Sequence, residues 1–121
     1  MKVSSQLRTH FPDGVFPAAC PSRVVLDHVT SKWGVLVLLA LSEGEPLRWS
    51  ELRRRAQGVS EKMLAQTLRT MEHDGFLLRD ARPEVPPHVE YSLTTRGEEL
   101  VALLVPLMSW IAANADDIVA A

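Results

Sequence analysis

The pattern of apolar and polar positions divides the chain into helical stretches, with a pair of strands between residues 76 and 93. Residues 1–19 contain prolines and a glycine and show no sustained period, which predicts a flexible arm. Ordered structure is expected to begin at Cys20, because Pro21 suits the first position of a helix. The positions that then repeat at helical spacing are Val24, Val25, His28 and Val29.

Residues 32–41 form the most apolar stretch of the chain, and they are apolar on every side. A buried strand is possible, but the length and the start at Lys32-Trp33 favour a helix buried on all faces. The following residues, 42–46, contain glycine and proline and end it. We interpret this stretch as the central helix of the core.

The next segment has the spacing of two short helices joined by a tight turn. After an extended piece over 47–49, Ser50 is placed to cap a helix over 51–56, which Gly58 closes. Ser60 is placed to cap a second helix that runs to Asp74. Two helices joined in this way are typical of a helix-turn-helix, in which the first helix braces the second in a groove of DNA.

A β-hairpin is expected to follow the second of these helices. Residues 76–82 have the pattern of a strand, and residues 89–93 alternate apolar and polar side chains. The connecting residues 83–88 include three prolines, which stiffen the tip of the hairpin. The predicted fold class is therefore α+β: a mainly helical winged helix-turn-helix in which the hairpin is the wing.

A long helix capped by Thr94 or Thr95 completes the pattern, and Pro106 is expected to kink it. Its apolar surface is too wide for a monomer, which predicts a dimer interface formed with the N-terminal helix. The alternative is that the N-terminal helix covers this surface within one chain. The expected interface residues are Val24, Val25, His28, Leu100, Leu104, Leu107, Met108, Trp110 and Ile111.

A length of 121 residues is enough for one domain. We therefore expect an arm over 1–19 and a DNA-binding and dimerisation domain over 20–121. The content of 46% hydrophobic and 23% charged residues is ordinary for a soluble protein. The first residues lack the apolar run of a secretory signal, and the run 33–41 is too short to span a bilayer, so a cytoplasmic protein without membrane contact is expected.

The net charge of −2 does not by itself suggest a nucleic-acid partner, but its distribution does. Residues 48–82 contain eight basic and five acidic side chains, whereas the remainder contains five basic and ten acidic ones. This asymmetry favours one basic face on an acidic body.

A helical wheel of residues 60–74 separates a buried side from an outward side. Leu64, Leu68 and Met71 fall together on the buried side. The outward stripe holds Lys62, Gln66, Arg69 and His73, and it contains no acid. Such a stripe suits phosphates and base edges, although a plain solvated face gives the same pattern.

The expected DNA contacts come from three places. The N-terminal half of the second helix is expected to read bases, and Arg69 to meet a phosphate. The wing is expected to lie over the flanking backbone or minor groove, with Arg79 further back on the strand. The residues assigned to these contacts are Ser60, Lys62, Met63, Gln66, Thr67, Arg69, Arg79, Arg82, Val85 and His88.

Several motifs in order resemble the HxlR family of winged-helix regulators, a branch of the MarR-like repressors. They are Cys20-Pro21, Lys32-Trp33, the runs 51–54, 59–66 and 68–75, the segment 83–87, and residues 89–94 with Gly97. The resemblance covers the chain from Cys20 onward. It implies a dimer built from the first and last helices, a recognition helix beginning at Ser60, a wing at 83–88, and a Lys32 near DNA phosphates.

The chain departs from this family pattern at two positions. Thr67 and His88 stand where such proteins often carry arginine. Both departures remove a fixed positive charge from the expected DNA side, which predicts weaker binding or a different operator.

Cys20 is the only cysteine and opens the first predicted helix. In similar proteins this cysteine often senses oxidants or electrophiles, and a helix N-terminus favours a reactive thiolate. Oxidation or adduct formation would then shift the dimer helices and change the distance between the recognition helices. The alternative is an inert, partly buried side chain.

The sequence offers little support for an enzyme or a metal site. His10, His28, His73 and His88 lack ligand spacing, and no nucleophile–base set or phosphate loop appears, so we expect no catalytic residues, no metal and no cofactor. The predicted function is a homodimeric repressor on a roughly palindromic DNA operator, with an oxidant or small-molecule signal. Two alternatives are a regulator gated by an effector beneath the dimer helices and a winged-helix protein-interaction module.

Overall fold

The computed structural model describes residues 3–120 and divides the chain into two compact units, with the boundary in the sequence between Thr30 and Ser31. The sequence predicted a division between residues 19 and 20. Residues 1, 2 and 121, which belong to the expected arm and domain, lie outside the described residues.

The first unit contains helices α1 (Val3–Arg8) and α2 (Pro21–Val29). The expectation of a flexible arm differs from the structure, in which α1 is helical and the rings of Phe11 and Phe16 lie 4.6 Å apart. Arg23 of α2 donates a hydrogen bond of 3.0 Å to the Phe16 carbonyl. Phe11 and Phe16 also line one small cavity together with Leu7 of α1 and Leu26 of α2. Apolar side chains from both helices are therefore grouped in this unit.

The second unit is built around α3 (Lys32–Ala40), which packs against α4 (Trp49–Arg55), α5 (Glu61–His73) and α6 (Thr95–Ala120). A short 3-10 turn, η1 (Leu41–Glu43), follows α3. Val37, Leu38 and Leu41 are 0–1% exposed, which confirms the central role of this segment. Burial on all faces was wrong for the single chain, because Val35 and Leu36 are only half-buried.

The helix-turn-helix consists of α4 and α5. Helix α4 begins at Trp49, earlier than the predicted start after Ser50, because the Glu51 carboxylate accepts a hydrogen bond of 3.2 Å from the Arg48 backbone N–H. At α5 the prediction is confirmed, since the Ser60 hydroxyl accepts from the Met63 N–H at 3.0 Å. Gly58 in the turn has a positive φ of 92°, which favours glycine.

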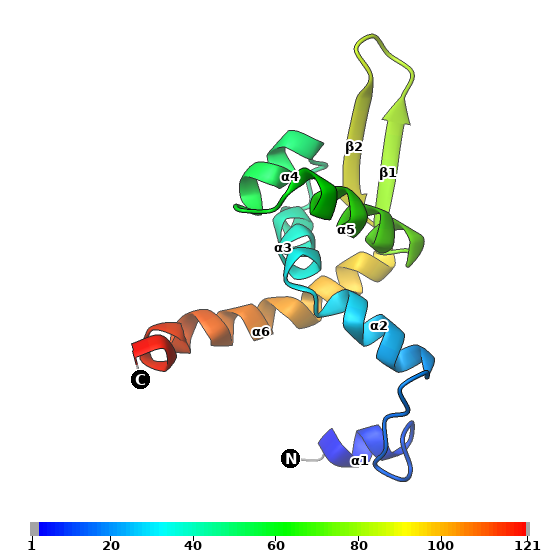
Figure 1. Cartoon of the computed structure of the whole chain (residues 1–121), viewed down its shortest axis with the longest axis vertical. Coiled ribbons are helices and arrows are strands. Elements are labelled where there is room, and N and C mark those ends of the chain that lie inside the picture. The colour runs from blue at the N-terminus through cyan, green and yellow to red at the C-terminus, as the bar shows by residue number, and fades with distance from the viewer. Residues whose placement is uncertain (1–2, 121) are drawn as a thin grey trace. The chain divides into compact units, whose positions relative to one another are not determined.

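The wing is an antiparallel hairpin of β1 (Leu77–Arg82) and β2 (His88–Leu93), each within one residue of its predicted bounds. Its register pairs Leu77 with Leu93 and Arg82 with His88. Leu47 adds a single bridge to Tyr91 through two backbone hydrogen bonds of 2.8 and 2.9 Å. The hairpin projects beyond α4 and α5, with the loop at its far end (Figure 1).

Residues at the start of α6 hold the C-terminal end of α5 in place. The Thr94 hydroxyl donates to the Gly75 carbonyl at 2.5 Å and accepts from the Gly97 N–H at 3.0 Å, so Thr94 is the cap. Arg96 donates to the Asp74 carbonyl at 2.7 Å. The C-terminal end of α5 is therefore fixed by the side chains of Thr94, which caps α6, and Arg96 in its first turn.

Helix α6 runs for 26 residues with Pro106 inside it. Its buried residues are Gly97, Val101 and Leu104, so Leu104 belongs to the core of its own chain and its assignment to the dimer interface was wrong. By length and composition alone α6 could cross a membrane, with a mean hydropathy of 1.3 and only 11% of that window buried. Much of its apolar surface is thus uncovered in one chain.

Replacing Gly97 with alanine is expected to destabilise the second unit by about 1–3 kcal/mol, the usual cost of overpacking. A Cβ at this position would collide with the Phe76 carbonyl oxygen, which is backbone and has little freedom to move. Denaturant unfolding of Gly97→Ala measures the loss. The exposed Ser109→Ala on the same helix is the control, and equal stability of Gly97→Ala and the natural chain would contradict the close packing.

Candidate nucleic-acid interface

The two faces of α5 are arranged as the helical wheel predicts. Leu64, Leu68 and Met71 are 0–2% exposed and face the core. The side chains of the outward stripe are all exposed: Lys62, Gln66, Arg69 and His73. Met63 is also accessible, with 40% of its surface exposed. The helix therefore presents hydrogen-bond donors to solvent over most of its length.

Thr67 does not belong to this exposed face. It is only 7% exposed, because it lies next to Met71 at the edge of the inner side of the helix. The expectation that Thr67 contacts DNA was therefore wrong.

The start of α5 is braced by α4 and by its own cap. Ser60 is exposed, but its hydroxyl oxygen already accepts from the Met63 N–H, which leaves its proton for an external acceptor. Arg53 of α4 forms an ion pair of 3.1 Å with Glu61. Both side chains are substantially exposed, so the pair contributes little to stability.

Lys32 lies at the beginning of α3 and is exposed. Its Nζ lies 4.4 Å from the ring centroid of Trp33, within the range of a cation–π contact. A Cβ on Gly58 would lie 3.8 Å from the same ring, so Trp33 neighbours the turn between α4 and α5. The structure thus places the Lys32 segment beside the helix-turn-helix.

Arg82 and His88 of the wing lie close to acidic side chains. Arg82 lies 3.5 Å from Asp80 and 3.6 Å from Glu90. His88 Nε2 lies 3.0 Å from Glu90 Oε2, a contact that is an ion pair only when the imidazole is protonated. His88 is half-buried, whereas Val85 at the tip is fully exposed.

The Glu90 carboxyl has a pKa below its ordinary value of 4.5. The His88 imidazole is the main cause, and the charges of Arg82 and Arg48 act in the same direction, whereas partial desolvation acts in the opposite one. A lowered pKa in the folded protein means that the contribution of Glu90 to stability is complete above pH 4.5 and is lost as the pH falls through the folded pKa.

We therefore expect Glu90→Gln to reduce stability slightly above pH 4.5, with the difference from the natural chain disappearing in more acidic solution. Urea unfolding at pH values between about 3 and 6 measures this difference. Glu84→Gln, in the exposed loop of the wing, is the control. A difference that stays constant over the whole range would show that Glu90 does not act through its charge.

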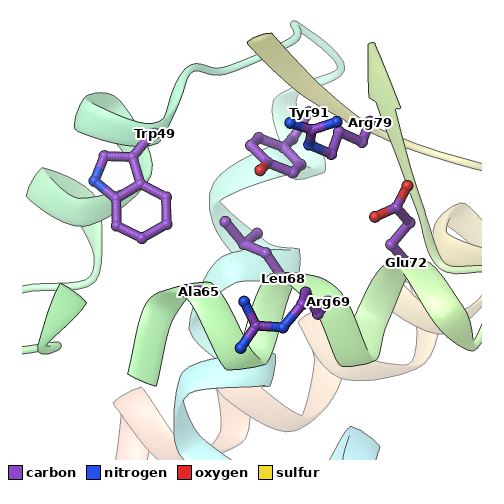
Figure 2. Close-up of a pocket in the computed structure, with 7 residues that line it drawn as sticks. All are labelled: Trp49, Ala65, Leu68, Arg69, Glu72, Arg79 and Tyr91. Atoms are coloured by element: carbon purple, nitrogen blue, oxygen red, sulfur yellow. The ribbon is translucent and has the colours of Figure 1, made fainter. Parts of the chain in front are cut away.

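A cleft of about 390 Å³ separates the recognition helix from the base of the wing (Figure 2). Its lining residues are Trp49, Ala65, Leu68, Arg69, Glu72, Arg79 and Tyr91. Sequence reasoning assigned Arg69 and Arg79 to DNA but missed the cleft. The helical wheel places positions 65, 69 and 72 on one flank of α5, which forms one wall of the cleft. Arg79 and Tyr91, which pair across the hairpin, contribute to the opposite wall.

The remaining candidates lie outside this face. Cys20 occupies the N-cap position of α2 and is a half-buried free thiol. On the same helix, Val24 and Val25 are 45–47% exposed, and His28 is half-buried. On α6, Leu107, Trp110 and Ile111 are 38–59% exposed, whereas Leu100 and Met108 are half-buried. Within residues 3–120, no three His, Cys, Asp or Glu side chains are grouped closely enough for a metal ion.

A helix-turn-helix with an exposed donor stripe, followed directly by a projecting hairpin, defines a winged helix-turn-helix protein. The family model described as HxlR-like helix-turn-helix matches residues 28–118. This chain belongs to that family. It is a transcriptional regulator with a DNA-binding helix-turn-helix fold and not an enzyme.

Individual relatives agree with this placement. The HTH-type transcriptional regulator YtfH of Escherichia coli K12 is 52% identical over 120 residues, which span 99% of this chain and 92% of that protein. The solved structure of a putative transcriptional regulator ytfH from Salmonella typhimurium is 54% identical, with a TM-score of 0.82 over 88% of this chain and 95% of that one. The redox regulator HypR in its reduced form is 31% identical, with a TM-score of 0.75 over 84% and 100% of the two chains.

Proposed function

We propose that this protein is a homodimeric repressor that binds a roughly palindromic operator through the exposed stripe of α5. The observation that carries the proposal is the row of Lys62, Gln66 and Arg69 along one exposed face of a helix that is fixed at both ends. An amide and an ammonium group near the start of a recognition helix suit adenine and guanine edges in the major groove.

Phosphate contacts would position this helix on the duplex. Arg69, Arg79 and Lys32 are exposed cations on the helix-turn-helix and the base of the wing. Contacts of this type fix register but carry no base information. In the proposed complex Arg82 contributes less than a free arginine, because Asp80 and Glu90 already neutralise much of its charge. Val85 would touch the flanking groove at the tip of the wing.

The dimer is supported by apolar side chains that one chain leaves uncovered. Leu103, Leu107 and Trp110 of α6 are 52–72% exposed. Monomeric soluble proteins rarely expose a long apolar stripe of this kind, which marks an interaction surface. Pairing two chains through α6, with Val24 and Val25 of α2 at the interface, would cover it. A regulator assembled in this way would act in the cytoplasm.

We propose further that the Cys20 thiol senses the signal that releases the protein from DNA. Cys20 stands at the start of α2, and one structural relative is described as a redox regulator. Oxidation or alkylation of Cys20 would displace α2 and alter the spacing of the two recognition helices. If this holds, Cys20→Ser retains operator binding but loses the release that diamide causes. Equal diamide-induced release of Cys20→Ser and the natural protein would exclude the thiol switch.

Binding to the DNA upstream of the protein's own gene tests the main proposal. Mobility-shift and footprinting experiments should show a protected site, and affinity should fall steeply as salt is raised, because phosphate contacts release counterions. A scrambled site of the same composition is the control. Equal affinity for the natural and scrambled sites, or no binding at low salt, would refute sequence-specific regulation.

A further inference from the structure

The cleft between α5 and the wing contains charged side chains that lack partners within the protein. Among residues 3–120, no hydrogen bond or ion pair involves the side chain of Arg69, Glu72 or Arg79. Arg69 and Glu72 come from adjacent turns of α5, and Arg79 comes from β1. Two guanidinium groups and one carboxylate are therefore available to a molecule that enters the cleft.

The rest of the cleft suits a flat ring. Leu68 is buried and forms part of the floor, and Tyr91 is only 8% exposed. Figure 2 shows Trp49 on one side, Glu72 on the other, and the Tyr91 hydroxyl turned toward the space between them. A volume of about 390 Å³ lies within the usual range for small-molecule sites, which combine apolar walls with a few polar groups.

Glu72 restricts which anion fits. A small anion with only acceptor oxygens, such as inorganic phosphate, meets the Glu72 carboxylate when it enters the cleft, and this repulsion opposes its binding there. A ligand with an acidic group for the arginines and an N–H donor for Glu72 satisfies all three side chains. Arginine recognises a planar carboxylate through paired hydrogen bonds, which makes a carboxylate the matching acidic group.

We propose that this cleft binds a small aromatic acid that carries an N–H donor, with its carboxylate on Arg69 and Arg79 and its donor on Glu72. The ring lies between Trp49 and the floor of Leu68 and Tyr91. Because Arg69 and Arg79 also belong to the proposed DNA surface, the ligand and the operator compete. Only this competition depends on the proposed function, since binding of the ligand is measured without DNA.

Calorimetric titration of the full-length protein with 3-aminobenzoate, benzoate and aniline tests the site. We expect 3-aminobenzoate to bind with a Kd below about 1 mM, benzoate to bind at least about fivefold more weakly, and aniline not to bind. Arg79→Gln and Arg69→Gln should each lower the affinity for 3-aminobenzoate at least about tenfold. Arg54→Gln, an exposed arginine outside the cleft, is the matched control and should change nothing.

Glu72→Gln separates recognition of the donor from simple attraction of anions. Removing the repulsive carboxylate should raise benzoate affinity and abolish the preference for 3-aminobenzoate. Glu99→Gln, an exposed acid on α6, should retain the preference. Circular dichroism checks folding of each variant. If Arg79→Gln does not fold, Tyr91→Phe replaces it, and a several-fold weaker ligand affinity supports the site.

The competition is measured with operator DNA. Saturating 3-aminobenzoate should weaken operator binding about five- to tenfold, and operator should weaken ligand binding equally. No binding of 3-aminobenzoate at 10 mM, binding that both arginine variants retain, or an unchanged preference in Glu72→Gln would overturn the proposal. Ligand binding without any DNA binding would instead refute the repressor function and leave the cleft site standing.

Discussion

Replacing Lys62 and Gln66 together with alanine is expected to lower operator affinity at least about 100-fold. Each good contact with a base edge contributes about 1–3 kcal/mol of discrimination, and a dimer loses its contacts in both half-sites. Both side chains are exposed, so the free energy of unfolding should change by no more than about 0.5 kcal/mol. Fluorescence anisotropy with labelled operator measures the affinity, and urea unfolding measures the stability.

The matched control for this pair is Gln6→Ala with Arg8→Ala, an exposed amide and cation on α1. This control should bind the operator like the natural protein. Weak residual binding of the Lys62 and Gln66 variant to any DNA should remain, because the phosphate contacts are intact. Retention of sequence-selective binding by that variant would show that α5 does not read the operator.

Introducing aspartate at Leu107 and Trp110 is expected to convert the protein to monomers and to reduce operator affinity at least about 100-fold. These side chains are 52% and 59% exposed on one flank of α6, and a buried unpaired carboxylate costs several kcal/mol. A monomer also loses the gain from holding two half-sites at once. Light scattering after gel filtration gives the mass, and anisotropy gives the affinity.

Ser109→Asp provides the control for added negative charge. Ser109 is exposed and lies about 160° around α6 from Leu107 and about 100° from Trp110. This variant should remain dimeric and bind the operator. If the Leu107 and Trp110 variant keeps the mass of the natural protein, the apolar flank of α6 is not the dimer interface.

The sequence predicted the parts of the fold that local rules determine. The positions of Leu64, Leu68 and Met71 follow from helical periodicity, and the cap at Ser60 follows from its hydroxyl. The strand bounds follow from alternation and from the prolines between them. Each of these features depends on residues close together in the chain, so one sequence is enough to find them.

The parts that the sequence missed depend on contacts between distant residues. Thr67 is a small polar residue beside an apolar stripe, and only packing against the core decides that it is buried. His88 lies next to Glu90 because alternate residues of a strand share one face. The sequence prediction considered the basic residues of the wing without their acidic neighbours. The cleft requires Trp49, Arg79 and Tyr91 to meet α5, which no local pattern reveals.

The same limit applies to α6. Leu104 and Leu107 both belong to the predicted apolar stripe, but the structure buries Leu104 within its own chain and leaves Leu107 exposed. Periodicity identifies an apolar face without saying which part of it the chain itself covers. The division between core and interface therefore needs the positions of α3 and β2, against which α6 packs.

Changing the spacing between operator half-sites tests the central claim most directly. Two α5 helices on one side of a dimer must enter major grooves about one helical turn apart, or a multiple of it. Inserting five base pairs between the half-sites rotates one by about half a turn. We predict that affinity then falls to that of a single half-site and recovers when ten base pairs are inserted. Equal affinity for all three spacings would contradict a dimer that reads DNA with two α5 helices.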